Sequence, residues 1–167
     1  MPSFEKGADP SVAKARAQAL RLLKFRARSE TELKERLAGK GCSPVVIETI
    51  LNEYKKKNFV NDEKYARYFA AQQMASKPQG KRAILQKLKS KGIVGPAACE
   101  AVDKATEEKS ELEVAREIAQ ERFLHFRGLD LPAQQRRLFG FLSRRGFPSD
   151  VVYRVVKEVT KNNDEVI

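Results

Sequence analysis

The sequence predicts an all-α protein made of three tandem three-helix units that form an elongated curved array. In each of three segments, two apolar residues four apart are followed, four residues later, by a glycine. Apolar residues then recur six, nine and ten residues after that glycine. The three glycines, Gly41, Gly92 and Gly146, lie 51 and then 54 residues apart. A repeat of this length is typical of small helical modules that stack on their neighbours, with function on a surface.

The apolar positions of the repeat are small or branched residues at helical spacing. They are Leu33, Leu37, Ile47, Ile50 and Leu51 in the first segment, Ile84, Leu88, Ala98, Ala101 and Val102 in the second, and Leu138, Leu142, Val152, Val155 and Val156 in the third. We expect repeats over 13–57, 58–108 and 109–161, with a disordered lead over 1–12 and a flexible tail over 162–167.

Local signals place the helices of the first repeat. Alanine and leucine on one face predict a helix over 11–25. Ser29 and Glu32 form a capping box, in which each side chain binds a free amide at a helix start, and this box opens a second helix. That helix ends at Lys40, because Gly41 can take the left-handed conformation that closes a helix. Ser43-Pro44 starts the third helix.

The second and third repeats follow the same order. In the second, we expect helices from Asn61-Asp62-Glu63 to 74, from 80 to 91, and from Gly95-Pro96 to 106. In the third, a capping box at 110–113 opens a helix to 125, Pro132 opens the next, and Pro148-Ser149-Asp150 begins the last. The segment 127–131 is expected to be a loop.

Composition agrees with a helical protein that has no membrane span. The chain lacks tryptophan and has none of the runs of β-branched residues that strands favour. No segment approaches the 18 or so consecutive apolar residues that a span requires, and residues 1–10 do not resemble a signal peptide. Two cysteines at helical positions, Cys42 and Cys99, fit a reducing cytoplasm.

Charge is the main indication of function. The chain has 33 basic and 22 acidic residues, a net charge of +11, which favours an acidic partner, nucleic acid first. The expected middle helices differ: 30–40 is neutral, whereas 80–91 and 133–145 hold five and four basic residues and no acid. We predict a contact ridge formed by Lys81, Arg82, Lys87, Lys89, Arg136, Arg137, Arg144 and Arg145.

Two other interpretations of the basic helices stay open. They could be solvated faces with an incidental bias of sign. Each helix pair could also read DNA with its second helix in the major groove. Against that, the third helix of the first repeat is apolar over a wide arc that includes Val45, Val46 and Ile47, which is more typical of a core helix.

The sequence favours a non-enzymatic protein that needs no cofactor. His125 is the single histidine, has no nucleophile or carboxylate at a recognisable spacing, and could not complete a metal site with only two cysteines. Asp62 and Glu63 lie in the first turn of a helix, where the helix dipole favours carboxylates in any protein.

Three stretches resemble the motifs of a known family. Arg28-Ser29-Glu30-Thr31-Glu32-Leu33, Phe59-Val60-Asn61-Asp62-Glu63-Lys64-Tyr65-Ala66 and Gly80-Lys81-Arg82-Ala83-Ile84 with Lys91-Gly92-Ile93 are similar to the signatures of the RecX family. The resemblance covers about residues 13–160. The chain departs from the pattern at Ala83, where the family commonly has a basic residue; here Arg82 stands one place earlier.

The resemblance implies a regulator of recombination, DNA repair and the SOS response. RecX-like proteins are tandem three-helix arrays that lie in the groove of the RecA filament on DNA and restrain its activities. The expected partners are therefore a RecA filament and, through weak salt-dependent contacts, single- or double-stranded DNA. We expect a monomer.

Overall fold

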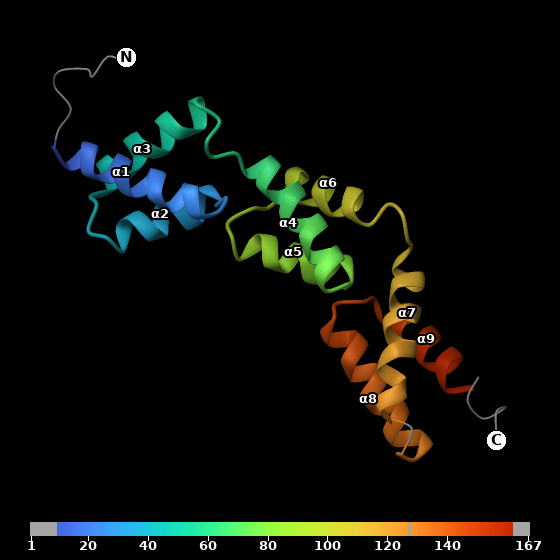
Figure 1. Ribbon diagram of the computed structural model, residues 1–167. Coiled ribbons are helices and arrows are strands. Elements are labelled where there is room, and N and C mark those ends of the chain that lie inside the picture. Colours follow the sequence, from blue (N-terminus) through green and yellow to red (C-terminus); the bar gives the residue numbers. More distant parts are fainter. Residues whose placement is uncertain (1–9, 127, 162–167) are drawn as a thin grey trace. The chain divides into compact units, whose positions relative to one another are not determined.

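All regular structure in the described part of the chain is helical. The computed structural model describes residues 10–126 and 128–161, which contain nine α-helices and one short 3₁₀ helix (Figure 1). The helices fall into three consecutive triplets, so the prediction of an all-α fold with three tandem three-helix units is confirmed. No described helix has the length and apolar character needed to cross a bilayer.

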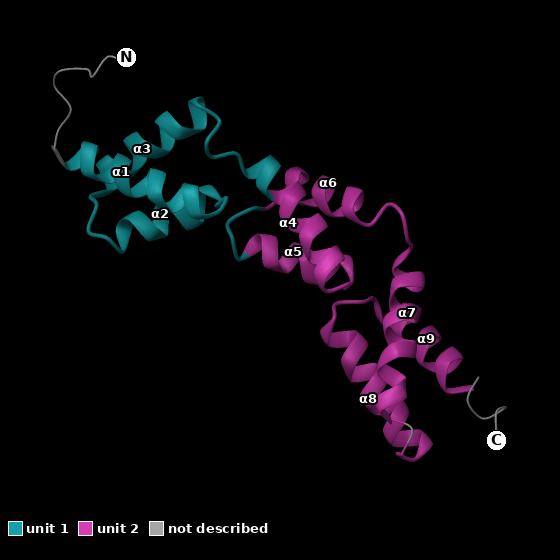
Figure 2. Cartoon of the chain, in the orientation of Figure 1, with its two compact units in different colours: residues 1–65, 90–93 teal, residues 66–89, 94–167 magenta. Residues whose placement is uncertain are grey.

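The described chain divides into two compact units (Figure 2). Unit 1 comprises residues 1–65 and 90–93, and unit 2 comprises residues 66–89 and 94–167. Unit 1 contains α1 (Pro10–Phe25), α2 (Glu30–Ala38), α3 (Pro44–Lys56), the start of α4 (Asp62–Ser76), and the turn at 90–93. That turn comes from the second repeat, although it lies in the unit formed by the first.

Unit 2 holds the remaining helices. These are the rest of α4, α5 (Lys81–Lys89), α6 (Pro96–Ala105), α7 (Glu111–Phe123), η1 (Leu124–Phe126), α8 (Leu131–Arg144) and α9 (Ser149–Lys161).

The apolar positions of the repeat form the interiors of the two units. All fifteen repeat positions named above are buried. In unit 1 they join one core with Ala15, Ala19 and Tyr54, and the Tyr54 hydroxyl donates to the carbonyl oxygen of Arg16 at 3.0 Å. The core of the third repeat adds Phe123, Phe126 and Phe147. The repeated pattern therefore predicts the interior correctly.

The helix starts form for the expected reasons. Both capping boxes are present: Ser29 with Glu32 at the start of α2, and Ser110 with Glu113 at the start of α7. Ser43 caps α3, with Pro44 in the first turn. The three repeat glycines have φ of +81°, +80° and +80°, the left-handed region that glycine adopts without a steric penalty.

Several boundaries differ from the expectation. α1 begins at Pro10, inside the expected disordered lead; residues 1–9 and the expected tail at 162–167 lie outside the described residues. α2 ends at Ala38, two residues before Lys40. α8 begins at Leu131, because the Asp130 side chain accepts from the backbone amide of Ala133 and caps the helix earlier than Pro132.

One core expectation is wrong. Val45 is 76% exposed, whereas Val46 and Ile47 are buried. The apolar arc of α3 is therefore narrower than the sequence suggests, although the rest of it is core as predicted.

Candidate nucleic-acid and partner interface

The eight residues predicted to form a contact ridge all lie in unit 2. Lys81, Arg82, Lys87 and Lys89 belong to α5, Arg136, Arg137 and Arg144 belong to α8, and Arg145 caps the end of α8. The structure gives them different surroundings, which divide them into exposed residues and residues that already have partners.

Five arginines of unit 2 line two neighbouring hollows, and we call this surface the arginine face: Arg82, Arg122, Arg136, Arg137 and Arg144. Arg82 and Arg144 line a hollow of about 340 Å³ beside the Gly146 turn. Arg144 also lines a second hollow of about 400 Å³, together with the other three arginines and with Phe126 and Phe141. Because Arg144 belongs to both hollows, the arginine face is continuous.

The arginine face lacks the acids that would neutralise it. Arg82, Arg136, Arg137 and Arg144 are exposed, and no ion pair joins any of them to a carboxylate of residues 10–126 or 128–161. Gathering like charges without a counter-charge costs free energy. The planar guanidinium forms paired hydrogen bonds with phosphate or carboxylate. An anionic partner would therefore relieve the repulsion.

Gly140 on α8 has no side chain, and this leaves space for the guanidinium of Arg144. A Cβ atom on Gly140 would lie 3.1 Å from Nη1 of Arg144. Arg144 therefore lies over the glycine, on the surface of the helix. Arg122 contacts the rings of Phe126 and Phe141, each 5.4 Å from its guanidinium carbon, and such contacts favour a defined position for a cation.

Two of the three lysines predicted as contacts on α5 are less available to bind a partner than the sequence suggests, because they already have partners within unit 2. Lys81 forms an ion pair with Asp103 at 2.6 Å. The Lys87 ammonium donates to the side-chain oxygens of Gln73 and Gln79, at 2.5 and 2.9 Å. Burial lowers the pKa of Lys87, and the nearby charges of Lys77 and Arg145 add to this. Lys89 is exposed. Arg82 and Lys89 are thus the better contact candidates on α5.

Arg145 has a structural partner inside unit 2. Its guanidinium donates to the carbonyl oxygen of Pro78 at 2.7 Å and lies over the ring of Phe141, 4.9 Å from the centroid. Burial lowers the pKa of Arg145, and the nearby positive charge of Arg122 lowers it further. Arg145 therefore holds the loop before α5 in place, and its replacement would disturb the fold as well as the surface.

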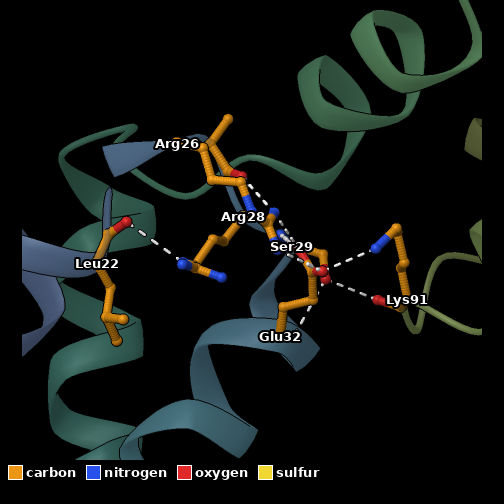
Figure 3. A network of polar contacts seen from close by, with 7 residues as sticks. Leu22, Arg26, Arg28, Ser29, Glu32 and Lys91 are labelled. Atoms are coloured by element: carbon orange, nitrogen blue, oxygen red, sulfur yellow. Dashed lines mark hydrogen bonds and ion pairs between the residues drawn. The ribbon is translucent and has the colours of Figure 1, made fainter. Parts of the chain in front are cut away.

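The loop that Arg145 holds belongs to a contact that occurs twice in the chain. We call it the repeat junction: the turn after the middle helix of one repeat binds the start of the middle helix of the preceding repeat. In unit 1, the Ser29 hydroxyl donates to the carbonyl oxygen of Lys91 at 2.7 Å (Figure 3). The amide of Glu30 donates to the Asp62 carboxylate at 2.8 Å. Residues of the second repeat thus bind the free amide and the cap of α2.

Glu32 is the centre of the charged network at this junction (Figure 3). Its carboxylate accepts two hydrogen bonds from Arg26, each 3.1 Å long, and one from Lys91 at 2.7 Å. Desolvation alone would raise the pKa of Glu32, but the hydrogen bonds and positive charges of Arg26 and Lys91 outweigh it and lower the pKa to about 2. Glu32 therefore stays ionised throughout the ordinary pH range.

The junction in unit 2 uses equivalent positions, and one of its two donors is a backbone amide in place of the Ser29 hydroxyl. The amide of Gly80 donates to the carbonyl oxygen of Arg145 at 2.9 Å. The amide of Lys81 donates to the Glu111 carboxylate at 2.8 Å. Asp62 and Glu111 are each the first residue of a helix. Each carboxylate is favoured by the dipole of its own helix, as predicted for Asp62. Each also accepts a hydrogen bond from a backbone amide at the start of a neighbouring helix.

Sequence reasoning named several of these residues but missed the contacts that they form between repeats, although a signal was present. A basic residue precedes each repeat glycine, in Lys40-Gly41, Lys91-Gly92 and Arg145-Gly146. The second and third of these pairs form junctions. Lys40, in the first repeat, is exposed.

The described residues offer no assembled metal site. Among them, no three His, Cys, Asp or Glu side chains gather closely enough to hold a metal ion. His125 lies exposed on η1, Cys42 is half-buried, and Cys99 is exposed. The side chains that do gather on the described surface are the arginines of the arginine face.

Tandem three-helix repeats joined by shared turns, with a cluster of exposed arginines in unit 2, define a helical-repeat protein. Three family models match in the order of the repeats: the first three-helix domain of RecX at residues 15–53, the second at 61–102 and the third at 109–156. The chain belongs to the RecX family.

Individual relatives agree with this family. "Regulatory protein RecX" of Amycolatopsis mediterranei is 31% identical over 158 residues, which cover 95% of this chain and 90% of the relative. The protein of the same name from Syntrophotalea carbinolica is 37% identical over 144 residues, 85% of this chain and 94% of the relative. The crystal structure of RecX from Lactobacillus salivarius has a TM-score of 0.73 at 22% identity, covers 89% of this chain and 96% of its own, and supports the fold.

Proposed function

We propose that this chain is a regulatory protein that binds RecA–DNA filaments and inhibits or modulates their recombinase, ATPase and co-protease activities. Its relatives carry the name regulatory protein RecX. The observation that carries the proposal is the arginine face: exposed arginines of unit 2 that lack acidic partners among the described residues. A DNA filament coated with protein offers phosphates and carboxylates to such a face. The protein acts in the cytoplasm, as a monomer and without catalysis of its own.

The alternative is a sequence-tolerant DNA-binding protein that acts without RecA. The same face favours it, because unpaired arginines bind phosphates of any sequence. The two functions differ in where the affinity resides, and one titration separates them.

In that titration, we expect the chain to depress the single-stranded-DNA-dependent ATPase activity of RecA and to keep doing so when further DNA is added in excess. A filament regulator finds its binding site on the filament, so free DNA competes poorly. A protein that only binds DNA would lose its effect as free DNA sequesters it. Recovery of the full ATPase rate in excess DNA would therefore contradict the proposal and support the alternative.

A charge reversal tests the arginine face. Arg137→Glu with Arg144→Glu should weaken binding to the RecA filament on single-stranded DNA. If both arginines contact phosphate, the slope of log affinity against log salt should fall by about 1.4, since each phosphate contact on a single strand contributes about 0.7. Fluorescence anisotropy at several salt concentrations measures both effects. We exclude Arg145 from this variant because it binds Pro78.

Lys34→Glu with Arg36→Glu is the matched control. Both residues are exposed on the middle helix of the first repeat, whose charges sum to zero over 30–40. Exposed substitutions usually change stability by less than about 0.5 kcal/mol, so both double variants should melt like the parent. Equal losses of binding in the two variants would show that the position of the charges is irrelevant and would overturn the arginine face.

A further inference from the structure

A third hollow in unit 2 contains two aromatic rings that contact each other, and one of these rings is exposed. It lies between α8 and α9, measures about 790 Å³, and is lined in part by Phe139 and Tyr153. The two rings meet in a T-shaped contact with their centroids 5.0 Å apart. Tyr153 is nevertheless 66% exposed. An exposed ring that is held by a second ring forms a rigid platform for a flat ligand.

The charges around this aromatic hollow differ from those of the arginine face. Arg136, Arg154 and Lys157 line it, and so does Asp150. Arg154 is already engaged with Glu158, at 3.0 Å. An acid in the lining and a partly neutralised arginine make this hollow less suited to a phosphate than the arginine face is, and better suited to a neutral aromatic group with a charged group nearby.

The two kinds of hollow adjoin each other on α8. Arg136 and Gly140 line both the aromatic hollow and the 400 Å³ hollow of the arginine face. A ligand that presents an anionic group and a flat ring in succession would therefore occupy both at once. Single-stranded nucleic acid has this structure, and proteins bind it by pairing basic grooves with aromatic stacking platforms.

We propose that the third repeat binds single-stranded DNA with one unpaired base stacked on Tyr153 in the aromatic hollow and with neighbouring phosphates on the arginine face. A duplex would satisfy the arginines but not the aromatic hollow, because its bases are stacked on one another. The choice of DNA over RNA rests on the proposed function. The stacked base itself follows from the chemistry of the two adjoining hollows.

A comparison of two labelled single strands by fluorescence anisotropy tests this site without any recombinase. One strand carries bases in mixed sequence, and the other is abasic, with the same length and number of phosphates. The parent chain should bind the strand with bases about five- to 150-fold more tightly, the range found for one stacked base. Tyr153→Leu should abolish most of this preference while binding the abasic strand as the parent does.

Tyr153→Phe is the control, because it keeps the ring and should keep the preference. Equal binding of the two strands by the parent, an unchanged preference in Tyr153→Leu, or no binding of either strand would each overturn the stacked base. Weaker binding of Tyr153→Leu to the filament alone, with the preference for bases intact, would assign the hollow to a protein segment and also overturn it.

The result of the comparison between the two strands is separable from the result of the ATPase titration. A chain that prefers strands with bases yet fails to depress the ATPase would refute the filament regulator and leave the stacked base standing. A chain that depresses the ATPase but shows no preference for bases would refute only the stacked base.

Discussion

Gly146→Ala should destabilise unit 2 by about 2–5 kcal/mol, from two causes that act together. Its φ of +80° costs an alanine about 1–2 kcal/mol. A Cβ atom would also lie 2.6 Å from Cβ and 2.7 Å from the backbone N of Ala83, at the start of α5. Overpacking of this kind costs about 1–3 kcal/mol. Chemical denaturation of the variant and the parent, followed by circular dichroism, measures the difference in unfolding free energy.

The equivalent glycine of the first repeat separates these two causes. Gly41 has nearly the same φ, +81°, but no atom other than those of its chain neighbours would lie within 4 Å of the added Cβ. Gly41→Ala should therefore cost only the conformational term, about 1–2 kcal/mol. Gly92→Ala should cost more than Gly41→Ala, because its Cβ would overlap Oγ1 of Thr31 and lie 2.6 Å from the Thr31 Cβ. Equal costs at Gly41 and Gly146 would show that the repeat junction in unit 2 is loosely packed.

Glu32→Gln should lower the stability of unit 1 by about 1–2 kcal/mol at pH 7. A pKa of about 2 in place of the ordinary 4.5 corresponds to about 3 kcal/mol of preferential interaction with the ionised form. Screening by water around a partly exposed network reduces that figure. The glutamine keeps the size and one acceptor oxygen of the side chain but loses the charge that Arg26 and Lys91 bind.

The pH dependence of this loss has a definite sign. Because folding lowers the pKa of Glu32, its contribution is fully present above the unfolded pKa near 4.5 and is lost as the pH falls through the folded value of about 2. The stability difference between Glu32→Gln and the parent should therefore be constant above about pH 5 and shrink between pH 4.5 and 2. Thermal melts across this range measure it.

Glu35→Gln is the control for the pH experiment. Glu35 lies exposed on the same helix, and no described ion pair includes it. Its substitution should change stability by less than about 0.5 kcal/mol at any pH. A loss in Glu32→Gln that persists unchanged to pH 2 would mean that the charge of Glu32 is not what stabilises unit 1.

Local signals in the sequence predict most of the fold. Leu33 and Leu37, four residues apart before Gly41, define a buried helix face and its end, and both features depend only on neighbours along the chain. The same holds for the caps at Ser29 and Ser110. Where a boundary was missed, as at Leu131, a side-chain cap competed with a proline signal one residue away.

The candidate site is less predictable, because the availability of a charge depends on distant partners. Arg144 and Arg145 are adjacent and identical in the sequence, yet the first is exposed and the second binds Pro78, 67 residues away. Lys87 similarly has partners on the preceding helix and loop. The aromatic hollow combines Phe139 and Tyr153 from two helices, and no local sequence pattern predicts that two such residues will be in contact.

The repeat junction of unit 1 has a consequence for synthesis on the ribosome. The turn at 90–93 belongs to unit 1, although 24 residues, 66–89, separate it from the rest of that unit. At about 5–20 residues per second, translation takes roughly one to five seconds to cross that gap. During this interval Ser29 and Glu32 have emerged but Lys91 has not, so the nascent first repeat lacks the partner that binds its middle helix. The first compact unit is therefore completed only after most of the second repeat has been translated.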